Sequence, residues 1–165
     1  LSGASIGDNK VADALIDMVQ AAGLPQGCLN FEITETAIIR KITDAKRLIS
    51  ALQEMGCRFA LDDFGSGLSS FGYLKQLNVD CLKIDGQFVR DITTDPTDRI
   101  FVKSIIDIAH TMNMRIVSEF VENHDVLETV QSMGSDYAQG FGIPRPEPLE
   151  SMVSMTTAMR VAGLD

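Results

Sequence analysis

Five short apolar runs recur along the chain, and amphipathic stretches separate them. The apolar runs lie at residues 29–35, 58–63, 80–85, 114–119 and 136–140. Apolar residues recur at helical spacing over residues 8–22, 43–55, 98–112 and 125–132, with a short helix near 70–76 and a last helix near 149–162. Strands that alternate with helices predict βαβ units and a parallel sheet. The runs are apolar at nearly every position, which is typical of parallel strands covered on both faces.

The polar exceptions in these runs fall on one face and near the end of each predicted strand. They are Glu32, Asp62, Lys83, Glu119 and Gln139. The carboxyl ends of parallel strands meet at one edge, so we expect these side chains to converge. A doubly wound sheet would instead bind its ligand behind a glycine fingerprint, which the sequence lacks. The α/β pattern therefore favours a TIM-type (β/α)8 barrel with a site at its C-terminal rim.

The chain is too short for a whole barrel of this kind. A TIM barrel has eight strands and about 250 residues, whereas the pattern predicts five strands in 165 residues. The opening residues 1–8, LSGASIGD, are interpreted as the tail of a further strand. We therefore expect one partial domain, residues 1–165, that lacks the first strands of the barrel. The missing strand pairing would come from another copy, another chain or an irregular sheet edge.

Composition limits the classes of partner. The chain has 14 Lys and Arg against 23 Asp and Glu, and its net charge of −9 argues against binding to nucleic-acid polymers or anionic membranes. An anionic ligand would therefore need bound metal or a few well-placed cations. No apolar stretch approaches the roughly 20 residues of a membrane span, and the N-terminus does not resemble a signal peptide. Three cysteines, an odd number, fit reduced core thiols in a cytosolic protein.

The residue types at the predicted rim suit phosphate chemistry. Carboxylates are oxygen ligands that Mg²⁺ and Mn²⁺ prefer, and adjacent Asp62 and Asp63 suit two ions better than one. Two such ions about 3.5–4 Å apart can activate water and neutralise a phosphodiester. Lys83 would add positive charge opposite the phosphate. An enolase-like barrel, in which carboxylates hold Mg²⁺ and a lysine removes a proton, is an alternative that these residues leave open.

Each of these residues taken alone has a purely structural interpretation. Asp62 and Asp63 could begin a turn, because Asp favours turns. Glu32 could be a solvated strand end, and Lys83 could be half of a structural ion pair. The two histidines lie at predicted helix ends without metal-ligand spacing and are assigned no role. Only the joint pattern favours an enzyme site.

Longer motifs carry a resemblance to a known family. They are FEITET (31–36), LDDFGSGLSSFGYLKQLNVDCLKID (61–85), SEFVEN (118–123) and AQGFGIPRP (138–146). In order and spacing they resemble the EAL domain, the cyclic di-GMP phosphodiesterase. The resemblance covers essentially the whole chain but only the C-terminal two-thirds of that domain. It implies a modified TIM barrel, two Mg²⁺ or Mn²⁺ ions at the C-terminal rim, and hydrolysis of cyclic di-GMP to linear pGpG.

The resemblance also implies a role for each rim residue. Glu32, Asp62, Asp63 and Glu119 match metal ligands, and Asp62 matches the carboxylate that bridges both ions and contacts substrate. Lys83 matches the lysine that contacts the attacking water and the phosphate. Glu119 matches, in addition, an acidic residue of the catalytic water shell.

Four further positions match family residues around the metal site. Gln139 matches a catalytic polar residue that holds the attacking water and contacts substrate. Gly140 and Pro144 match substrate-binding positions. Glu35 matches the glutamate that anchors the loop after the double aspartate, here residues 64–70. In the family, that loop links metal binding to dimer contacts.

The chain departs from the family pattern in two places. The Glu-Ala-Leu signature, an Asn ligand expected immediately before Leu1 and a basic residue that grips the nucleotide are absent. Phe120 stands where the family usually has Gly. The isolated segment is therefore expected to be inactive and to self-associate. A catalytically inactive receptor for cyclic di-GMP is the second alternative to the phosphodiesterase.

The resemblance finally implies partners and conditions. We expect cyclic di-GMP as the ligand, a homodimer, and an upstream sensory or GGDEF-type domain in the parent protein. The expected location is the cytoplasm, including the cytoplasmic part of a membrane-anchored parent. We expect Ca²⁺ to inhibit by occupying the site unproductively, because its longer bonds and looser geometry misplace the attacking water.

Overall fold

Five parallel strands form one sheet, in the order in which they occur in the chain. They are β1 (Asn30–Thr34), β2 (Arg58–Phe64), β3 (Cys81–Ile84), β4 (Arg115–Ser118) and β5 (Tyr137–Ala138). The sheet belongs to a computed structural model that describes residues 1–66, 72–143, 145 and 148. The predicted strands and their parallel pairing are confirmed, although β5 has two residues where five were expected.

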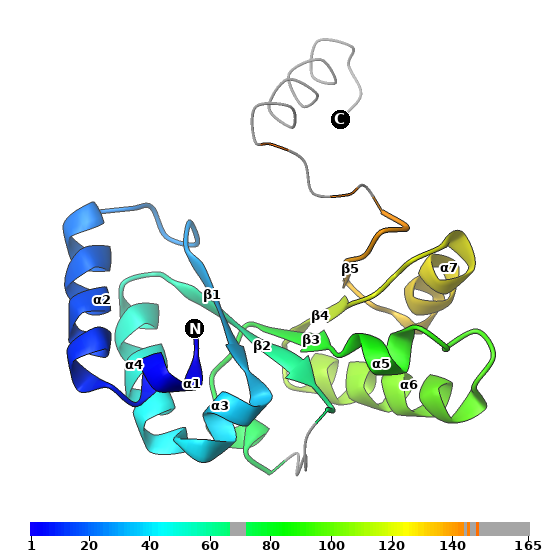
Figure 1. Cartoon of the computed structure of the whole chain (residues 1–165), viewed down its shortest axis with the longest axis horizontal. Coiled ribbons are helices and arrows are strands. Elements are labelled where there is room, and N and C mark those ends of the chain that lie inside the picture. The colour runs from blue at the N-terminus through cyan, green and yellow to red at the C-terminus, as the bar shows by residue number, and fades with distance from the viewer. Residues whose placement is uncertain (67–71, 144, 146–147, 149–165) are drawn as a thin grey trace.

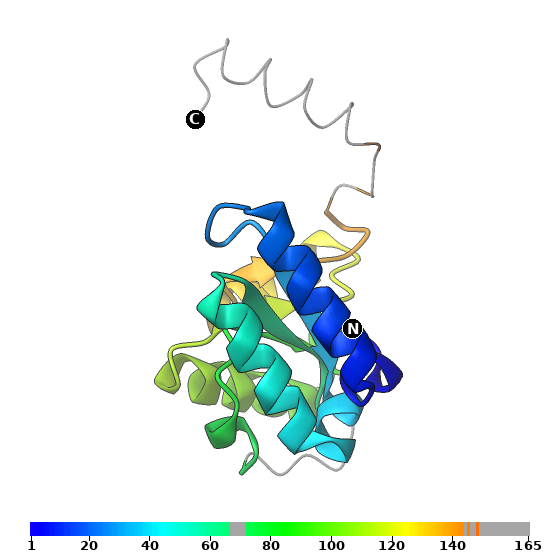
Figure 2. The same cartoon turned by 90° about the vertical axis from the view of Figure 1, so that its left-hand side faces the viewer.

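The connecting helices all cover one face of this sheet. They are α1 (Gly3–Ile6), α2 (Asn9–Ala22), α3 (Glu35–Arg40), α4 (Ile42–Glu54), α5 (Gly86–Val89), α6 (Pro96–Thr111) and α7 (His124–Met133), with a 3₁₀ turn η1 (Leu74–Gln76). Crossovers between parallel strands are right-handed. Because each new strand is added on the same side of the preceding one, every crossover helix lies on the same face of the sheet. Figure 1 shows α2 to α4 beside β1 and β2, and α5 to α7 beside β3 to β5; Figure 2 views the sheet from the α2 side. The other face is the inside of a partial barrel.

Local capping chemistry sets the helix boundaries. The Asp8 carboxylate caps α2 by accepting from an amide of its first turn, and Gly23 ends it with a left-handed φ of 56°. Asp95 caps α6 in the same way, and Pro96 occupies its first turn, where no amide partner is needed. The Asn123 side chain caps α7. These helices lie within two residues of the predicted ranges because their caps are encoded locally.

The opening segment differs from the expectation of a strand tail. Residues 3–6 form α1, which the Ser2 hydroxyl caps by accepting from the Ser5 amide at 3.1 Å. The Leu1 amino group donates to the carbonyl of Glu32, so Leu1 lies against edge strand β1. The expectation was therefore wrong for residues 3–6. A helix of one turn has too few residues to show a hydrophobic periodicity, so the sequence did not predict α1. The six-residue helix α3 was missed for the same reason.

The hydrophobic core lies between the sheet and its helices. Its central residues are Ile33, Phe59, Leu61, Leu82, Ile84 and Ile116 on the strands, Leu48, Ile49 and Leu52 on α4, and Val102, Ile105 and Ile106 on α6. Each buried side chain of this size contributes about 1.5–3 kcal/mol. Cys57 is buried and Cys81 is half-buried, as expected of core thiols, whereas Cys28 is exposed. The predicted last helix, 149–162, lies outside the described residues, as do residues 70–71 of the predicted helix near 70–76.

The inner face of the sheet is hollow and carries several polar side chains. It borders a cavity of about 330 Å³, whose lining includes Glu32, Ala60, Cys81, Lys83 and Gln139. These residues alternate along their strands with the apolar residues of the core. The rigid outer face therefore holds a row of polar side chains in place on the inner one.

Candidate active site

Strand β2 ends in a bulge that turns two adjacent aspartates to the same side. The β2–β3 register shifts between Leu61 and Phe64. The two residues between them, Asp62 and Asp63, stand opposite the single residue Lys83 of β3. Asp63 accommodates the extra residue with a φ of 54°, in a region that non-glycine residues rarely adopt. Strict alternation would have sent one carboxylate to the helix-covered face, whereas the bulge keeps both at the rim.

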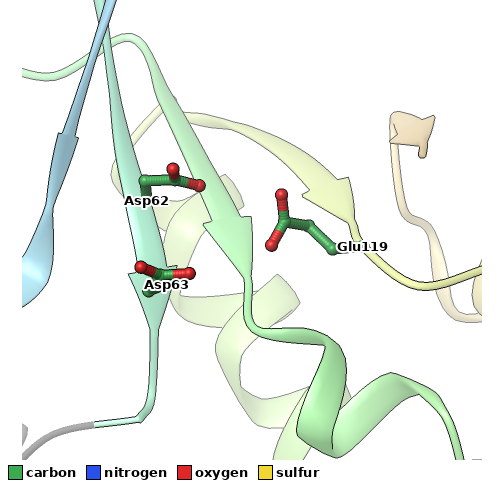
Figure 3. A group of neighbouring side chains, drawn as sticks. All are labelled: Asp62, Asp63 and Glu119. Carbon is green, nitrogen blue, oxygen red and sulfur yellow. The ribbon is translucent and has the colours of Figure 1, made fainter. Parts of the chain in front are cut away.

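Asp62, Asp63 and Glu119 form a compact acidic group. One carboxylate oxygen from each lies within 4.8 Å of the other two. Figure 3 shows the two aspartates at the end of β2 and Glu119 just beyond β4. Asp62 Oδ1 is buried and accepts no well-aligned hydrogen bond from the described residues, although the Lys83 ammonium lies 2.9 Å away. Such an acceptor suits a further positive partner, and the all-oxygen donor set fits a divalent cation.

Lys83 is the cation that these carboxylates surround. Its side chain is 7% exposed, and its Nζ lies 2.8 Å from Glu119, 2.9 Å from Asp62 and 3.3 Å from Glu32. Burial acts to lower the pKa of Lys83, but its close contacts with the Glu119 and Asp62 carboxylates outweigh burial, so the pKa is raised. With Asp63, four carboxylates share one ammonium. The excess negative charge is what bound divalent cations would neutralise.

Burial, together with neighbouring like charge, raises the pKa values of two members of the acidic group. Burial, followed by the charges of Asp62 and Asp85, raises the pKa of Asp63. Burial also raises the pKa of Glu119, by more than its hydrogen bond to Lys83 lowers it. Both shifts mean that the ionised carboxylates are destabilised where they stand. A bound cation would relieve this repulsion.

Glu35 holds both ends of the segment that follows the double aspartate. It is the first residue of α3 and is fully buried; its Oε2 accepts from the Gly65 amide at 3.0 Å. Its Oε1 accepts from the Tyr73 hydroxyl at 2.7 Å. Burial and the bond to Glu35 raise the pKa of Tyr73. These bonds support the predicted anchoring role. Tyr73 was not predicted, because it lies 38 residues from Glu35 and no local pattern links the two.

The other predicted site residues lie around the acidic group rather than within it. Glu32 contacts the Lys83 ammonium at 3.3 Å, and its side chain is 54% exposed. Gln139 and Gly140 follow β5 and line a recess beside Glu119. Pro144 lies outside the described residues. The ligand and substrate roles of these residues stay predictions.

Asp85 belongs to the rim although sequence reasoning assigned it no role. It follows β3, two residues after Lys83, and its charge contributes to the raised pKa of Asp63. Its side chain also caps α5 by accepting from the Gln87 amide at 2.9 Å. The sequence did carry a signal for it: side chains two residues apart on a strand point to the same face, so Asp85 was expected on the face of Lys83.

Comparison with known proteins identifies the family. The family model described as the EAL domain matches residues 1–146. The chain belongs to the EAL domain family. Its fold class, predicted from the resemblance, is confirmed: the sheet is part of the TIM-like barrel of this family. None of the described helices combines the length and apolar character needed to cross a bilayer.

Relatives of this EAL chain include named phosphodiesterases and solved EAL domains. It is 42% identical over 151 residues to the cyclic di-GMP phosphodiesterase PdeB of Shewanella oneidensis, a match that covers 92% of this chain and 18% of PdeB. The EAL domain of Mycobacterium smegmatis DcpA superposes with a TM-score of 0.85 at 30% identity, over 96% of this chain and 71% of that one. The FimX EAL domain of Pseudomonas aeruginosa bound to c-di-GMP has a TM-score of 0.82 at 33% identity, over 89% and 60%. The chain thus spans less than a fifth of PdeB.

Proposed function

We propose that the protein containing this EAL chain hydrolyses cyclic di-GMP to linear pGpG. The observation that carries the proposal is the group Asp62, Asp63 and Glu119 around the ammonium of buried Lys83. An acidic group of this kind suits cations that in turn hold an anionic phosphodiester. The relative PdeB is named a cyclic di-GMP phosphodiesterase, and the FimX EAL domain binds c-di-GMP. Chemistry and relatives support the same substrate.

The proposed cofactor is a pair of Mg²⁺ or Mn²⁺ ions. Asp62, Asp63 and Glu119 would hold them, with Glu32 completing the set from β1. The resemblance to the family makes Asp62 the proposed bridging ligand, and its buried Oδ1 accepts no aligned hydrogen bond from the described residues. Such ions, when bound, supply a hydroxide nucleophile from water at neutral pH and neutralise the phosphoryl oxygens. The hard oxygen donors fit this class of cation.

Lys83 and Gln139 would act on the substrate rather than on the cations. The Lys83 ammonium keeps its proton, and its charge would stabilise a phosphoryl oxygen as negative charge develops there. Gln139 follows β5, and its amide can hold the attacking water by donating or accepting a hydrogen bond. Glu119, 2.8 Å from the ammonium, would orient the same water. Gly140 and Pro144 are proposed substrate contacts.

The surroundings of the site complete the proposal. Residues 1–165 would form part of one EAL domain that works as a homodimer in the cytoplasm, under an upstream sensory or GGDEF-type domain. The segment held by Glu35 at Gly65 and Tyr73 would connect the cation site with the dimer contact.

Turnover by the intact protein is the experiment that tests the activity. Purified protein is incubated with cyclic di-GMP and Mg²⁺ or Mn²⁺, and linear pGpG is followed by chromatography. We expect conversion that needs the cation. Saturable nucleotide binding without any pGpG would instead establish the receptor alternative. Activity confined to carboxylate substrates would establish the enolase-like one.

A further inference from the structure

Gly65, two residues after Asp63, lies where no side chain would fit. A Cβ at this position would lie 2.9 Å from the Phe88 ring and 3.1 Å from the Phe101 ring. Its φ of 99° is in the left-handed region that favours glycine. The backbone of Gly65 therefore lies directly against two aromatic side chains and has no room to move toward them.

The two rings belong to helices outside the sheet. Phe88 lies in α5, which follows β3, and Phe101 lies in α6. Their ring centroids are 4.4 Å apart, with planes inclined at 43°, so the rings pack on each other. Both side chains are half-buried and pack against the hydrophobic core. The helices, rather than β2, therefore hold the ring pair in place beside Gly65.

Gly65 is also held by the buried carboxylate of Glu35. The Gly65 amide donates to Glu35 Oε2 at 3.0 Å, and Glu35 is the first residue of α3. The ring pair limits where the Gly65 backbone lies, and the hydrogen bond fixes the direction of its amide. Contacts from α3, α5 and α6 thus converge on one residue beside the acidic group.

A tight turn connects Gly65 to Asp63. The Asp63 carbonyl accepts from the Ser66 amide at 3.3 Å and from the Ser66 hydroxyl at 2.8 Å. Residues 63–66 therefore close a turn of four residues in which Gly65 is the third. A displacement of Gly65 would change the direction of the Asp63 carboxylate. Asp62 precedes the turn, and the Lys83 ammonium lies 2.9 Å from its carboxylate.

We propose that Phe88 and Phe101 are positioning residues that set the direction of the Asp63 carboxylate through Gly65. The inference rests on the proposed function, because the cations that Asp63 would hold belong to it. Mg²⁺ demands near-ideal ligand geometry. Loss of a group that orients a metal ligand typically costs about 10–100-fold in metal affinity or activity. The ring pair acts on Asp63 and leaves Asp62, which Lys83 contacts, in place.

Mn²⁺ titration of Phe101→Ala in the intact protein tests the positioning role without catalysis. Removal of the ring opens space beside Gly65, so the turn can shift. We expect Mn²⁺ affinity, measured by calorimetry, to fall about tenfold, the lower end of the range for such groups. A lower thermal midpoint with unchanged Mn²⁺ affinity would show that the ring serves packing alone, and would overturn the proposal.

Ile106→Val is the matched control on the same helix. Ile106 is fully buried in α6 and lies beside Gly134. Loss of a buried methylene should lower the thermal midpoint and leave Mn²⁺ affinity within about twofold. An equal fall in Mn²⁺ affinity in both variants would mean that general loosening of α6, and not the contact with Gly65, weakens the cation site.

A double-mutant cycle shows whether the ring acts through Asp63. In an Asp63→Asn background the ligand that the ring positions is already lost, so Phe101→Ala should lower Mn²⁺ affinity little further. Additive losses would contradict the proposal. Phe101→Leu keeps apolar bulk without the flat ring and enters the same cycle if Phe101→Ala does not fold.

Turnover of cyclic di-GMP by the wild-type protein separates this inference from the proposed function. Coupling between Phe101 and Asp63 in Mn²⁺ affinity, without any pGpG from the wild-type protein, would refute hydrolysis alone. Normal hydrolysis by the wild-type protein, without coupling between the two residues, would refute the positioning role alone.

Discussion

The two ends of the parallel sheet use aspartates in opposite ways. At the amino end, Asp80 precedes β3 and accepts from the Phe59 amide at 2.8 Å. Asp136 precedes β5 and accepts from the Ile116 amide at 2.9 Å. Each carboxylate therefore satisfies a backbone donor at the start of a neighbouring strand. At the carboxyl end, the buried Asp62 Oδ1 accepts no aligned hydrogen bond from the described residues.

The pKa values show the same contrast. Burial alone would raise the pKa of Asp136, but hydrogen bonds from His110, Arg115 and the Ile116 amide lower it to about 2. At the other end, burial raises the pKa of Glu119 despite its bond to a lysine. Charge is satisfied at the amino end and crowded at the carboxyl end. In barrels of this type the first end serves stability and the second chemistry.

Unfavourable backbone conformations also differ between the amino and carboxyl ends of the sheet. Among the described residues, the non-glycine positions with positive φ are Asp63, Asn113 and Phe120. Asn113 lies in the turn before β4, and Asn tolerates this conformation well. Asp63 and Phe120 both stand at the carboxyl rim. Asp tolerates this conformation almost as well as Asn, so the bulky residue that resists it is Phe120, at the end that carries the proposed site.

Asp62→Asn should produce the largest difference between the two ends. Loss of the proposed bridging carboxylate should lower turnover of cyclic di-GMP by about 10³-fold or more, the scale of a principal electrostatic group. Because Asp62 also pairs with the buried Lys83 ammonium, turnover should be compared per folded molecule. Asp80→Asn is the matched control at the other end and should retain turnover per folded molecule. Undiminished activity in Asp62→Asn would refute the assignment.

Replacing Mg²⁺ by Ca²⁺ should affect the carboxyl end alone. Ca²⁺ forms longer, looser bonds to carboxylates, and misplacement of reacting groups by about 1 Å costs on the order of 10²-fold in rate. Turnover should fall by that factor, while the thermal midpoint still rises with added Ca²⁺. Rapid turnover in Ca²⁺ alone would show that the geometry of the cation does not matter.

Asp136→Ala should affect stability and not chemistry. The change removes acceptors for the Ile116 amide, Arg115 and His110, and an unsatisfied buried amide costs about 1–3 kcal/mol. We expect the free energy of unfolding to fall by about 2 kcal/mol in denaturant titrations, with kcat unchanged. A matched drop in kcat per folded molecule would break the separation of the two ends.

Tyr73→Phe should have a smaller effect, on both the stability of the fold and the rate of turnover. Buried Glu35 would lose one donor, for about 1–2 kcal/mol of stability, and would no longer link Gly65 to Tyr73. If this link positions the rim, kcat should fall a few-fold. Tyr137→Phe is the control, because Tyr137 is 57% exposed. Equal effects of the two changes would argue against the anchoring role.

Acid titration should give the smallest effect, at the amino end. The folded pKa of Asp136, about 2, lies below its ordinary value of 3.8, so its stabilisation is present above about pH 4. That stabilisation is lost as pH falls through 2, and after allowance for solvent screening it is about 1 kcal/mol. The acid slope of unfolding free energy should flatten in Asp136→Asn. An unaltered slope would mean that other carboxylates dominate acid unfolding.

Elements with a local signal were predictable. The strands and the helices α2, α4, α6 and α7 follow from apolar periodicity and from caps such as Asp8 and Asn123, which act within one helical turn. The convergence of Asp62, Lys83 and Glu119 followed from strand parity and parallel order. The short helices α1 and α3 did not, because one or two turns carry too few residues for a period.

Contacts between distant segments were beyond the reach of local patterns. The bond between Glu35 and Tyr73, the hydrogen bond between His110 and Asp136, and the recess lined by Phe120 and Phe141 join residues that share no period or motif. Adjacent aspartates were recognisable, but their common direction depends on a bulge measured against β3. Register is a relation between two strands, so one strand's sequence cannot show it.

The sequence by itself determined the chemical identity of the rim and the order of its strands. Acidic residues, a lysine and their spacing are one-dimensional properties, and parallel βαβ order aligns strand ends without further information. Tertiary structure alone decided which carboxylates crowd one another and which are satisfied. Burial and repulsion depend on distances across the sheet, and those distances are set by packing of the core rather than by neighbours along the chain.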